Sequence, residues 1–287
     1  MFNSNNMALL LCLCIGVSII NVKLESQVER NNKMNEKIEN KWLEHLKQTT
    51  KLSGQFEGKD KTGVSVVFDW ARLNVQSPEF AETLKSIGDV TSKAYVPVES
   101  GFLRANPNLE FDDHYLKQFE AFFLNGHENV DWTAVGEKVQ QVIKQFYSMD
   151  HSKFSADNMY FFVTVKDKKT KEMLGAIIFF VMPEYPYGDV KCTSFAVLPS
   201  AQGRGLGKFL MSSIFIIIPD LNRIFLCTRP TNANALNAYR AWGFVDDVNP
   251  IKEPYFKANT NQWASFEYKV NSSDILQRIA KTLTDIK

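Results

Sequence analysis

The sequence predicts a mixed α/β fold, in which helices flank a central sheet and a helical extension precedes it. Two observations support this prediction. From residue 158 onward, short apolar and aromatic runs alternate with amphipathic segments, an order typical of a sheet covered by helices. Between residues 77 and 147, apolar residues recur at spacings of three and four, which indicates helices.

Size and composition allow a sizeable buried core, since the chain has 287 residues and is 45% hydrophobic. The 33 Lys and Arg residues nearly balance the 32 Asp and Glu residues, so no overall charge points to nucleic acid. The four histidines are scattered and no two cysteines have C-x-x-C spacing. We therefore expect no metal site.

An apolar leader is expected over residues 1–22. Ala8 to Ile20 is an uninterrupted run of apolar and small residues, which suits a signal peptide and is short for a spanning helix of about 20 residues. Positive residues follow this run and none precedes it. That asymmetry favours membrane association through residues 8–22, with the domain facing the cytoplasm. Cleaved export is the second interpretation, and a plain leader on a soluble protein is the third.

The segment after the leader is expected to be a charged helical linker, residues 23–54, because it is rich in Lys, Glu, Asn and Gln. Gly54 to Gly63 is interpreted as a turn-rich break. Val64 to Trp70 has the apolar content of a short buried strand.

Three helices are predicted next, within a helical part of the fold that spans residues 55–157. The first begins at Ser77-Pro78-Glu79, where a capping residue precedes a proline in the first turn. The other two cover residues 112–124 and 131–147, each with aromatic or aliphatic residues along one face.

The core of the fold is predicted over residues 158–270. The expected strands are Met159–Val165, Leu174–Met182, Cys192–Leu198, Ile224–Cys227 and Trp263–Val270, and the expected helices are Gly205–Ile217 and Asn232–Trp242. The charged run at residues 166–171 predicts a hairpin between the first two strands. Residues 271–287 predict a C-terminal amphipathic helix, capped by Ser272, Ser273 or Asp274.

A glycine-rich turn joins the third of these strands to a helix, and it reads Gln202-Gly203-Arg204-Gly205-Leu206-Gly207-Lys208. A helix N-terminus presents unpaired N–H groups and the positive end of its dipole, and glycines let the backbone approach a phosphate. Arg204 and Lys208 add positive charge. The turn therefore predicts an anion site. It departs from the P-loop at Phe209 and from the dinucleotide fingerprint at Lys208.

Two motifs resemble those of the Gcn5-related N-acetyltransferase (GNAT) family. Residues 202–207 fit its pyrophosphate loop, [QR]-x-x-G-x-[GA], and residues 195–199 resemble the strand that leads into it. Residues 232–244 fit N-x-x-A-x-x-x-Y-x-x-x-G-F. Because both occur in the expected order, the chain is identified as a member over residues 158–270. The resemblance implies a mostly antiparallel central sheet, acetyl-CoA as acetyl donor and an amine as acceptor.

The resemblance also implies roles for single residues. The strand at Phe195–Val197 would splay from its neighbour and pair with the pantetheine arm, the loop N–H groups would hold the pyrophosphate, and Tyr239 would protonate the departing thiolate. Packing inside the helix is the other interpretation of Tyr239. The implied cofactor-binding residues are Phe195, Ala196, Val197, Gln202, Gly203, Arg204, Gly205, Leu206, Gly207, Lys208 and Asn232.

The general base and the acceptor stay open at this stage. Cys227 stands where some relatives carry a glutamate, so a catalytically silent CoA-binding module tethered at a membrane is the alternative hypothesis. Glu184, Asp189 and Glu253 are candidate bases in expected loops. Small amines, antibiotics, peptide N-termini and lysine side chains all remain candidate acceptors.

Overall fold

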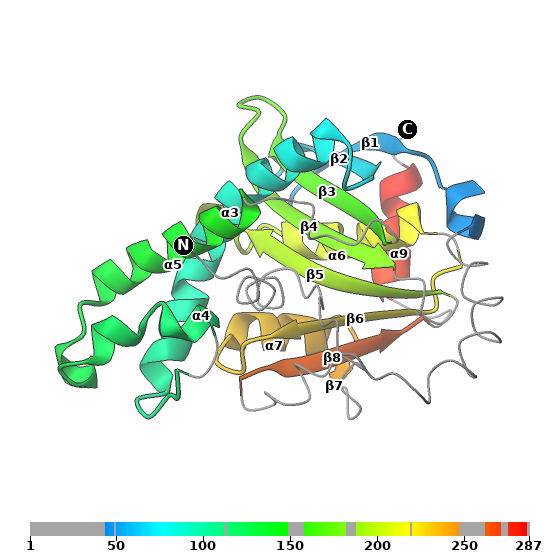
Figure 1. Ribbon diagram of the computed structural model, residues 1–287. Coiled ribbons are helices and arrows are strands. Elements are labelled where there is room, and N and C mark those ends of the chain that lie inside the picture. Colours follow the sequence, from blue (N-terminus) through cyan, green and yellow to red (C-terminus); the bar gives the residue numbers. More distant parts are fainter. Residues whose placement is uncertain are drawn as a thin grey trace, which may run out of the picture.

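The computed structural model describes residues 44–48, 50–111, 114–148, 158–181, 188–218, 220–246, 262–270 and 275–285. Within them lies an eight-stranded sheet with the strand order β1-β2-β3-β4-β5-β6-β8-β7 (Figure 1). Only β5 and β6 pair in parallel, and every other pair of neighbours is antiparallel. The mixed, mostly antiparallel sheet expected for a GNAT-type fold is therefore confirmed.

The elements follow the predicted order closely. The strands are β1 (Ser53–Lys59), β2 (Ser65–Leu73), β3 (Met159–Asp167), β4 (Met173–Val181), β5 (Asp189–Val197), β6 (Arg223–Thr228), β7 (Val245–Asp246) and β8 (Ala264–Lys269). The helices are α3 (Pro78–Ala105), α4 (His114–Lys117), α5 (Trp132–Tyr147), α6 (Leu206–Ile217), α7 (Ala233–Ala241) and α9 (Ile275–Asp285). Short 3-10 turns are η2 (Glu120–Phe123), η3 (His127–Asn129) and η5 (Pro199–Ala201).

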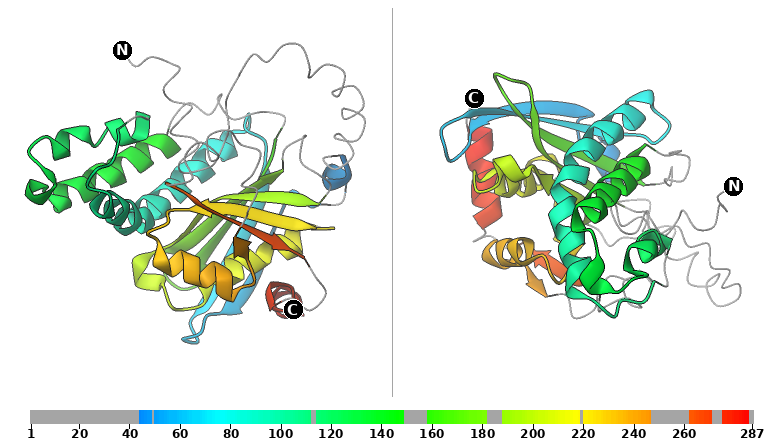
Figure 2. Two further views of the ribbon diagram at one scale, coloured as in Figure 1. Left: turned by 90° about the horizontal axis from the view of Figure 1, so that it is seen from below. Right: turned by 90° about the vertical axis from the view of Figure 1, so that its left-hand side faces the viewer.

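Both faces of the sheet are buried, because helices cover each of them. Helices α3 and α5 lie on one face, and α6, α7 and α9 on the other (Figure 2). Along β3, Tyr160 and Phe162 enter the core under α3 and α5, whereas Phe161 and Val163 enter the core under α6. Alternation across a sheet with two buried faces explains why β3 reads as one continuous apolar run.

Helix α3 begins as the sequence predicts. Ser77 is its N-cap, and the Ser77 side chain accepts a hydrogen bond of 3.2 Å from the Phe80 N–H. Pro78 follows in the first turn, where the missing N–H is no loss. The helix runs for 28 residues and packs lengthwise on α5. It therefore carries residues near its middle over the edge of β5.

The predicted helix at residues 112–124 is wrong as a single element. The structure has the short α4 and then η2, and residues 112–113 lie outside the described residues. Backbone bonds at 3-residue spacing, such as Phe122 N–H to Phe119 C=O at 2.9 Å, tighten the chain here. This tightening brings Phe123 against Phe111 and Trp132, so tertiary packing outweighs the helical pattern.

The predicted break at Gly54–Gly63 is also wrong for most of its length. Residues 53–59 form β1, which pairs with β2 in the register Phe56 to Phe68. Gly54 serves close packing, because a Cβ there would lie 2.5 Å from the Trp70 ring nitrogen. Only residues 60–63 make the turn, where the Asp60 carboxylate accepts the Thr62 N–H at 2.8 Å.

The predicted leader at 1–22, and the linker as far as residue 43, lie outside the described residues. The end of the linker joins the domain, because Leu46 is fully buried and its C=O accepts a hydrogen bond of 3.1 Å from Arg72. No helix in the described ranges is both long and apolar enough to cross a membrane.

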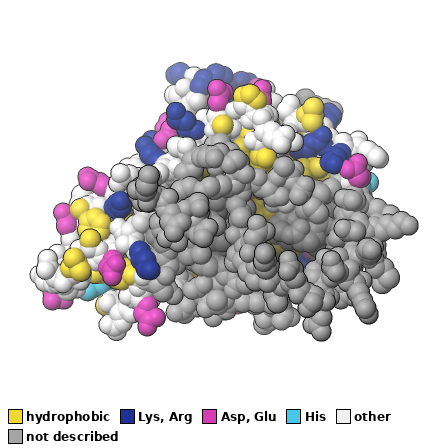
Figure 3. All heavy atoms as spheres, in the orientation of Figure 1, with side chains coloured by type: hydrophobic (Ala, Val, Ile, Leu, Met, Phe, Trp, Pro, Cys, Tyr) yellow, Lys and Arg dark blue, Asp and Glu magenta, His cyan; other side chains and the backbone are white. Residues whose placement is uncertain are grey.

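Two sequence predictions at the edges of the sheet are confirmed. In Figure 3, Lys and Arg side chains gather at the top of the view, over the hairpin between β3 and β4, where residues 166–171 hold four lysines. Helix α9 forms near the C-terminus, with Leu276 and Ala280 buried beside α6. Its predicted capping residues, 272–274, are outside the described ranges.

Two glycines of α3 predict opposite effects on stability. A Cβ at Gly88 would lie 2.5 Å from the Tyr147 Cβ, whereas a Cβ at Gly101 would meet nothing within 4 Å. Gly88→Ala should therefore destabilise the protein by about 1–3 kcal/mol through overpacking. Gly101→Ala should stabilise it by about 0.4–1 kcal/mol, because alanine restricts the unfolded chain. Urea unfolding measures both, and equal effects would contradict the α3–α5 packing.

Candidate active site

Strands β5 and β6 run together for only three residues and then part. Asp189, Val190 and Lys191 pair with residues 223–225, and no later pair forms in the described residues. The strands part at a bulge in β5. Phe179 of β4 faces Cys192 and Ile178 of β4 faces Ser194, so Thr193, which lies between them on β5, has no partner on β4. A bulge bends and twists its strand. The splay that the resemblance implied at Phe195–Val197 is therefore present.

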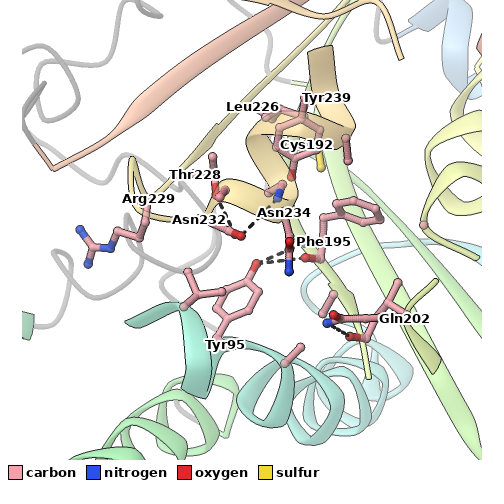
Figure 4. A pocket seen from close by; sticks show the side chains of 18 of the residues that line it. Tyr95, Cys192, Phe195, Gln202, Leu226, Thr228, Arg229, Asn232, Asn234 and Tyr239 are labelled. Carbon is pink, nitrogen blue, oxygen red and sulfur yellow. Dashed lines mark hydrogen bonds between the residues drawn. The ribbon is translucent and has the colours of Figure 1, made fainter. Parts of the chain in front are cut away.

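A cavity of about 820 Å³ opens at this parting. Its walls come from α3, the open side of β5, the loop before α6, the end of β6 and helix α7 (Figure 4). Of the predicted site residues, all but Arg204 line it: Phe195, Ala196, Val197, Gln202, Gly203, Gly205, Leu206, Gly207, Lys208, Asn232 and Tyr239. The fold thus brings two motifs that lie apart in the sequence to one cavity.

The glycine-rich turn ends in a helix N-terminus at one end of the cavity. Gly203 and Gly205 have φ of +77° and +85°, a conformation that side chains disfavour, and Gly205 caps α6 without a side-chain hydrogen bond. A Cβ at Gly207 would already lie 3.2 Å from the Phe195 ring. The N–H groups of Leu206 and Gly207 precede the first hydrogen bond of α6, which Lys208 donates to the Gly205 C=O, and they carry the positive end of the helix dipole.

Positive side chains gather beside this helix N-terminus. Lys208 and Lys61 both line the cavity, and the Lys61 stem passes over Gly205. Burial lowers the pKa of Lys208, and the charges of Lys61 and Arg278 lower it further. Two lysines beside a helix N-terminus place positive charge where an anion would bind. Lys61 was not predicted, because only the β1–β2 hairpin brings it here.

Contrary to the prediction, Arg204 does not line the cavity. Its Nε donates to the Asp60 Oδ2 at 2.5 Å, and its C=O accepts the Lys61 N–H at 3.0 Å. The Asp60 side chain is fully buried. Burial acts to raise the pKa of Asp60, but hydrogen bonds from Thr62 and Arg204 hold it below its usual value. Arg204 therefore fastens the β1–β2 turn to the loop and positions Lys61.

Tyr239 lies on α7 at the parting of the strands and is 5% exposed. Its ring packs beside Phe195 and Phe266, with centroids 6.3 and 5.6 Å away. Burial raises the pKa of Tyr239 well above its usual value, and nearby groups, Cys192 first, raise it further. The phenol therefore keeps its proton at neutral pH. It both packs and lines the cavity, so the two sequence interpretations are compatible.

Two residues that were predicted to contact the cofactor, Asn232 and Gln202, also make hydrogen bonds within the protein. The Asn232 side chain caps α7 by accepting the Ala235 N–H at 3.2 Å, and it donates to the Thr228 Oγ1 at 3.2 Å. Gln202 donates to the Val197 C=O at 3.3 Å (Figure 4). Their contact with a cofactor stays a prediction.

A buried ion pair, absent from the sequence predictions, also lines the cavity. Arg229 is 1% exposed and donates to Glu99 through Nη2 at 2.9 Å. Its guanidinium lies between the rings of Phe102 and Trp263, 4.1 Å from each centroid. Tyr115 donates to the same carboxylate at 3.1 Å. The sequence pattern of α3 does not set Glu99 apart from the other polar residues of the helix, because its partner, Arg229, lies 130 residues away.

Of the three candidate bases, the structure describes one, Asp189. Asp189 is wrong as a candidate, because its side chain is 1% exposed, binds Arg223 at 2.5 Å and does not line the cavity. Glu184 and Glu253 lie outside the described residues. Among the described lining residues, the carboxylate is that of Glu99, and both its oxygens accept from Arg229.

Two cysteines, Cys192 and Cys227, line the cavity. The Cys227 Sγ lies 3.4 Å from the Ser265 Oγ, and Cys192 is buried. Burial, followed by the neighbouring Cys227, raises the pKa of Cys192 well above its usual value, so it stays a thiol. No group of three or more His, Cys, Asp or Glu in the described part of the chain is placed to hold a metal ion.

Residues 123–244 match the model of the acetyltransferase (GNAT) family. The chain therefore carries a GNAT-family domain, as the two motifs predict. The match begins earlier than the predicted core, since it includes α5, and it ends before β7 and β8.

Solved structures of acetyltransferases resemble the chain at low identity. The PaiA N-acetyltransferase from Thermoplasma acidophilum, in complex with coenzyme A, is 12% identical, with 71% of this chain and 99% of that chain covered and a TM-score of 0.40. The GNAT domain of S. lividans PAT is 13% identical, with 75% and 97% covered and a TM-score of 0.40. Nourseothricin acetyltransferase is 17% identical, with 40% and 66% covered and a TM-score of 0.32.

The likeness to these structures is too low to carry an assignment of function. The chain spans 66% of the nourseothricin enzyme, just under two thirds of its length. No curated protein matches the chain. The family assignment therefore depends on the family match and on the two motifs.

The buried ion pair in the wall of the cavity predicts a large loss of stability on Glu99→Gln. The substitution leaves the Arg229 charge buried without its counter-charge, which should cost about 3–5 kcal/mol. Glu44→Gln is the control, because the Glu44–Lys47 pair is more than half exposed and should contribute under about 1 kcal/mol. Denaturant unfolding compares the two, and similar small losses would contradict a role for the buried pair.

Proposed function

We propose that the chain transfers the acetyl group of acetyl-CoA to an amine by direct attack, with Tyr239 as general acid. One observation carries the proposal: a single cavity joins the N-terminus of α6, the open edge of β5 and Tyr239. The N-terminus of α6 suits the phosphates of acetyl-CoA, the open edge of β5 suits its amide-bearing arm, and Tyr239 suits its thioester. The family match to acetyltransferases supports the same chemistry.

The phosphates of acetyl-CoA suit the α6 end of the cavity. The N–H groups from Gly203 to Gly207 provide donors, and the glycines provide room for close approach. Lys208 and Lys61 supply charge to several phosphate oxygens at once. Burial first, and then the charges of Lys61 and Arg278, lower the pKa of Lys208, and a bound anion opposes both effects by favouring the charged lysine.

The pantetheine arm suits the open edge of β5. An unaccompanied strand edge presents N–H and C=O groups, and an extended ligand with amide groups can add to it as a further strand. The edge leads from the loop at residues 202–208 back to Thr193, beside the parting of the strands. A ligand anchored by its phosphates therefore reaches Tyr239 with its far end.

The chemical step uses the proton of Tyr239. The amine lone pair attacks the thioester carbonyl carbon, the tetrahedral intermediate collapses, and the C–S bond breaks. The Tyr239 hydroxyl gives its proton to the sulfur, and the proton lost by the amine returns through solvent to the Tyr239 oxygen, which restores the phenol. Burial disfavours a bare thiolate, and it also disfavours the tyrosinate that the transfer leaves, since burial raises the pKa of Tyr239. Return of a proton to the Tyr239 oxygen is therefore part of the step.

The acceptor amine enters in its neutral form under this proposal. Glu99 is engaged by Arg229, and Cys227 is a poor substitute for a carboxylate base. These two facts also favour a second candidate, a CoA-binding module without turnover. Binding of acetyl-CoA with no CoA release from a panel of amines would support that second candidate.

Gly205→Val should weaken acetyl-CoA binding by at least about tenfold. The side chain opposes a φ of +85° and displaces Lys61, whose stem lies 3.1 Å from the added Cβ. Gly126→Val, with a φ of +89° on the helical extension, imposes similar backbone strain away from the cavity. Calorimetric titration should show the loss only at Gly205, and equal losses would remove the argument for a phosphate site.

Tyr239→Phe should lower turnover by about 10²–10⁴-fold and leave acetyl-CoA binding nearly unchanged, because only the acidic proton is removed. Tyr268→Phe is the control, since that buried hydroxyl lies outside the cavity and has no hydrogen-bond partner among the described residues. CoA release in the presence of an accepted amine measures turnover. Unchanged turnover in Tyr239→Phe would refute its role as the acid.

A further inference from the structure

The hydroxyl of Tyr95 lies at the open edge of β5. It accepts the Phe195 N–H at 3.3 Å and donates to the Phe195 C=O at 3.5 Å. Tyr95 belongs to α3, 100 residues earlier in the chain. Figure 4 shows this side chain pointing across the cavity at Phe195. One phenol therefore takes both backbone groups of the residue that faces the gap.

These contacts take the place of the hydrogen bonds that β6 would make if it continued beside β5. Strand β6 has turned away after Lys191, so the backbone groups of β5 beyond it need other partners. Tyr95 supplies them at Phe195, and Gln202 donates to the next C=O on the same side, that of Val197, at 3.3 Å. Two side chains thus occupy the edge on which a strand-like ligand would pair.

The geometry indicates that the Tyr95 contacts are exchangeable. Distances of 3.3 and 3.5 Å exceed the usual range for hydrogen bonds of this kind, about 2.7–3.2 Å. By contrast, Tyr147 also reaches β5, and its hydroxyl lies 2.7 Å from the Ser194 Oγ, outside the cavity. Pro97 follows Tyr95 by two residues and lacks an N–H, so the helix has one bond fewer at this turn.

We propose that the Tyr95 hydroxyl is a built-in competitor of the pantetheine arm for the backbone of Phe195. The inference rests on the proposed function. Pantetheine carries two amides, and either can satisfy the N–H and C=O that Tyr95 now holds. The cofactor must break the two Tyr95 bonds before it pairs with β5. Tyr95 is then a positioning residue that keeps the edge satisfied in the free protein and lowers its affinity for pantetheine.

Tyr95→Phe tests this directly, because it removes the hydroxyl and keeps the ring packed against both cores. Acetyl-CoA should bind the variant about two- to tenfold more tightly, since the bonds lost exist only in the free protein. Adenosine 3′,5′-bisphosphate, which lacks the pantetheine arm, should bind both forms equally. Tyr147→Phe is the matched control and should change the affinity for neither ligand.

Hydrogen exchange of the free protein gives a second measurement that needs no ligand. The amide of Phe195 should exchange faster in Tyr95→Phe than in the natural protein and stay unchanged in Tyr147→Phe. Thermal melting checks that each variant folds, and Tyr95→Leu replaces Tyr95→Phe if the latter does not. An unchanged exchange rate would remove the contact on which the inference depends.

The affinity results separate the failures. If acetyl-CoA binds the natural protein and Tyr95→Phe equally, the inference fails and the proposed function stands. If Tyr95→Phe binds acetyl-CoA more weakly, Tyr95 contacts the bound cofactor and does not compete with it. If acetyl-CoA binds none of the variants, the proposed function fails and the inference fails with it.

Discussion

The parting of β5 from β6 is the constraint on which the rest of the site depends. A parallel pair normally continues for the length of its strands, but the bulge at Thr193 ends this one after three residues. The gap exposes backbone groups in the middle of the sheet, where burial would otherwise require partners. Every wall of the cavity either fills this gap or borders it.

Helices on opposite faces meet at this gap. Tyr95 and Glu99 reach it from α3, on one face, while Tyr239 and the N-terminus of α6 reach it from the other. The Glu99–Arg229 pair joins α3 to the loop after β6 and lines the same cavity as the N-terminus of α6. Packing that holds the two layers together therefore also fixes the separation of the cavity walls.

The sequence predicts the order of the elements and the cofactor loop, because both depend on local pattern. Alternating apolar runs locate β3 and β4, and the glycines at 203, 205 and 207 locate the turn before α6. It misses β1, since an edge strand with alternating exposure and two glycines reads as a loop. Helix 112–124 is overpredicted, because its aromatic residues pack on their neighbours and not along one helical face.

Site residues that act through long-range contacts escape local reasoning altogether. Lys61, Tyr95 and Glu99 sit in segments whose patterns indicate only a turn or a helix, and their roles come from partners 100 or more residues away. Arg204 is the reverse case. Its place in a glycine-rich loop suggests a phosphate contact, yet a buried carboxylate from a distant hairpin binds its side chain.

The bond between Asp60 and Arg204 also bears on how the protein folds. It joins residues 144 positions apart, so the β1–β2 turn cannot dock until most of the chain has been synthesised. Contacts of such sequence separation raise the contact order and slow folding. The early hairpin must therefore wait with its edge exposed, and the part of the cavity beside the N-terminus of α6 is among the last parts of the molecule to be completed.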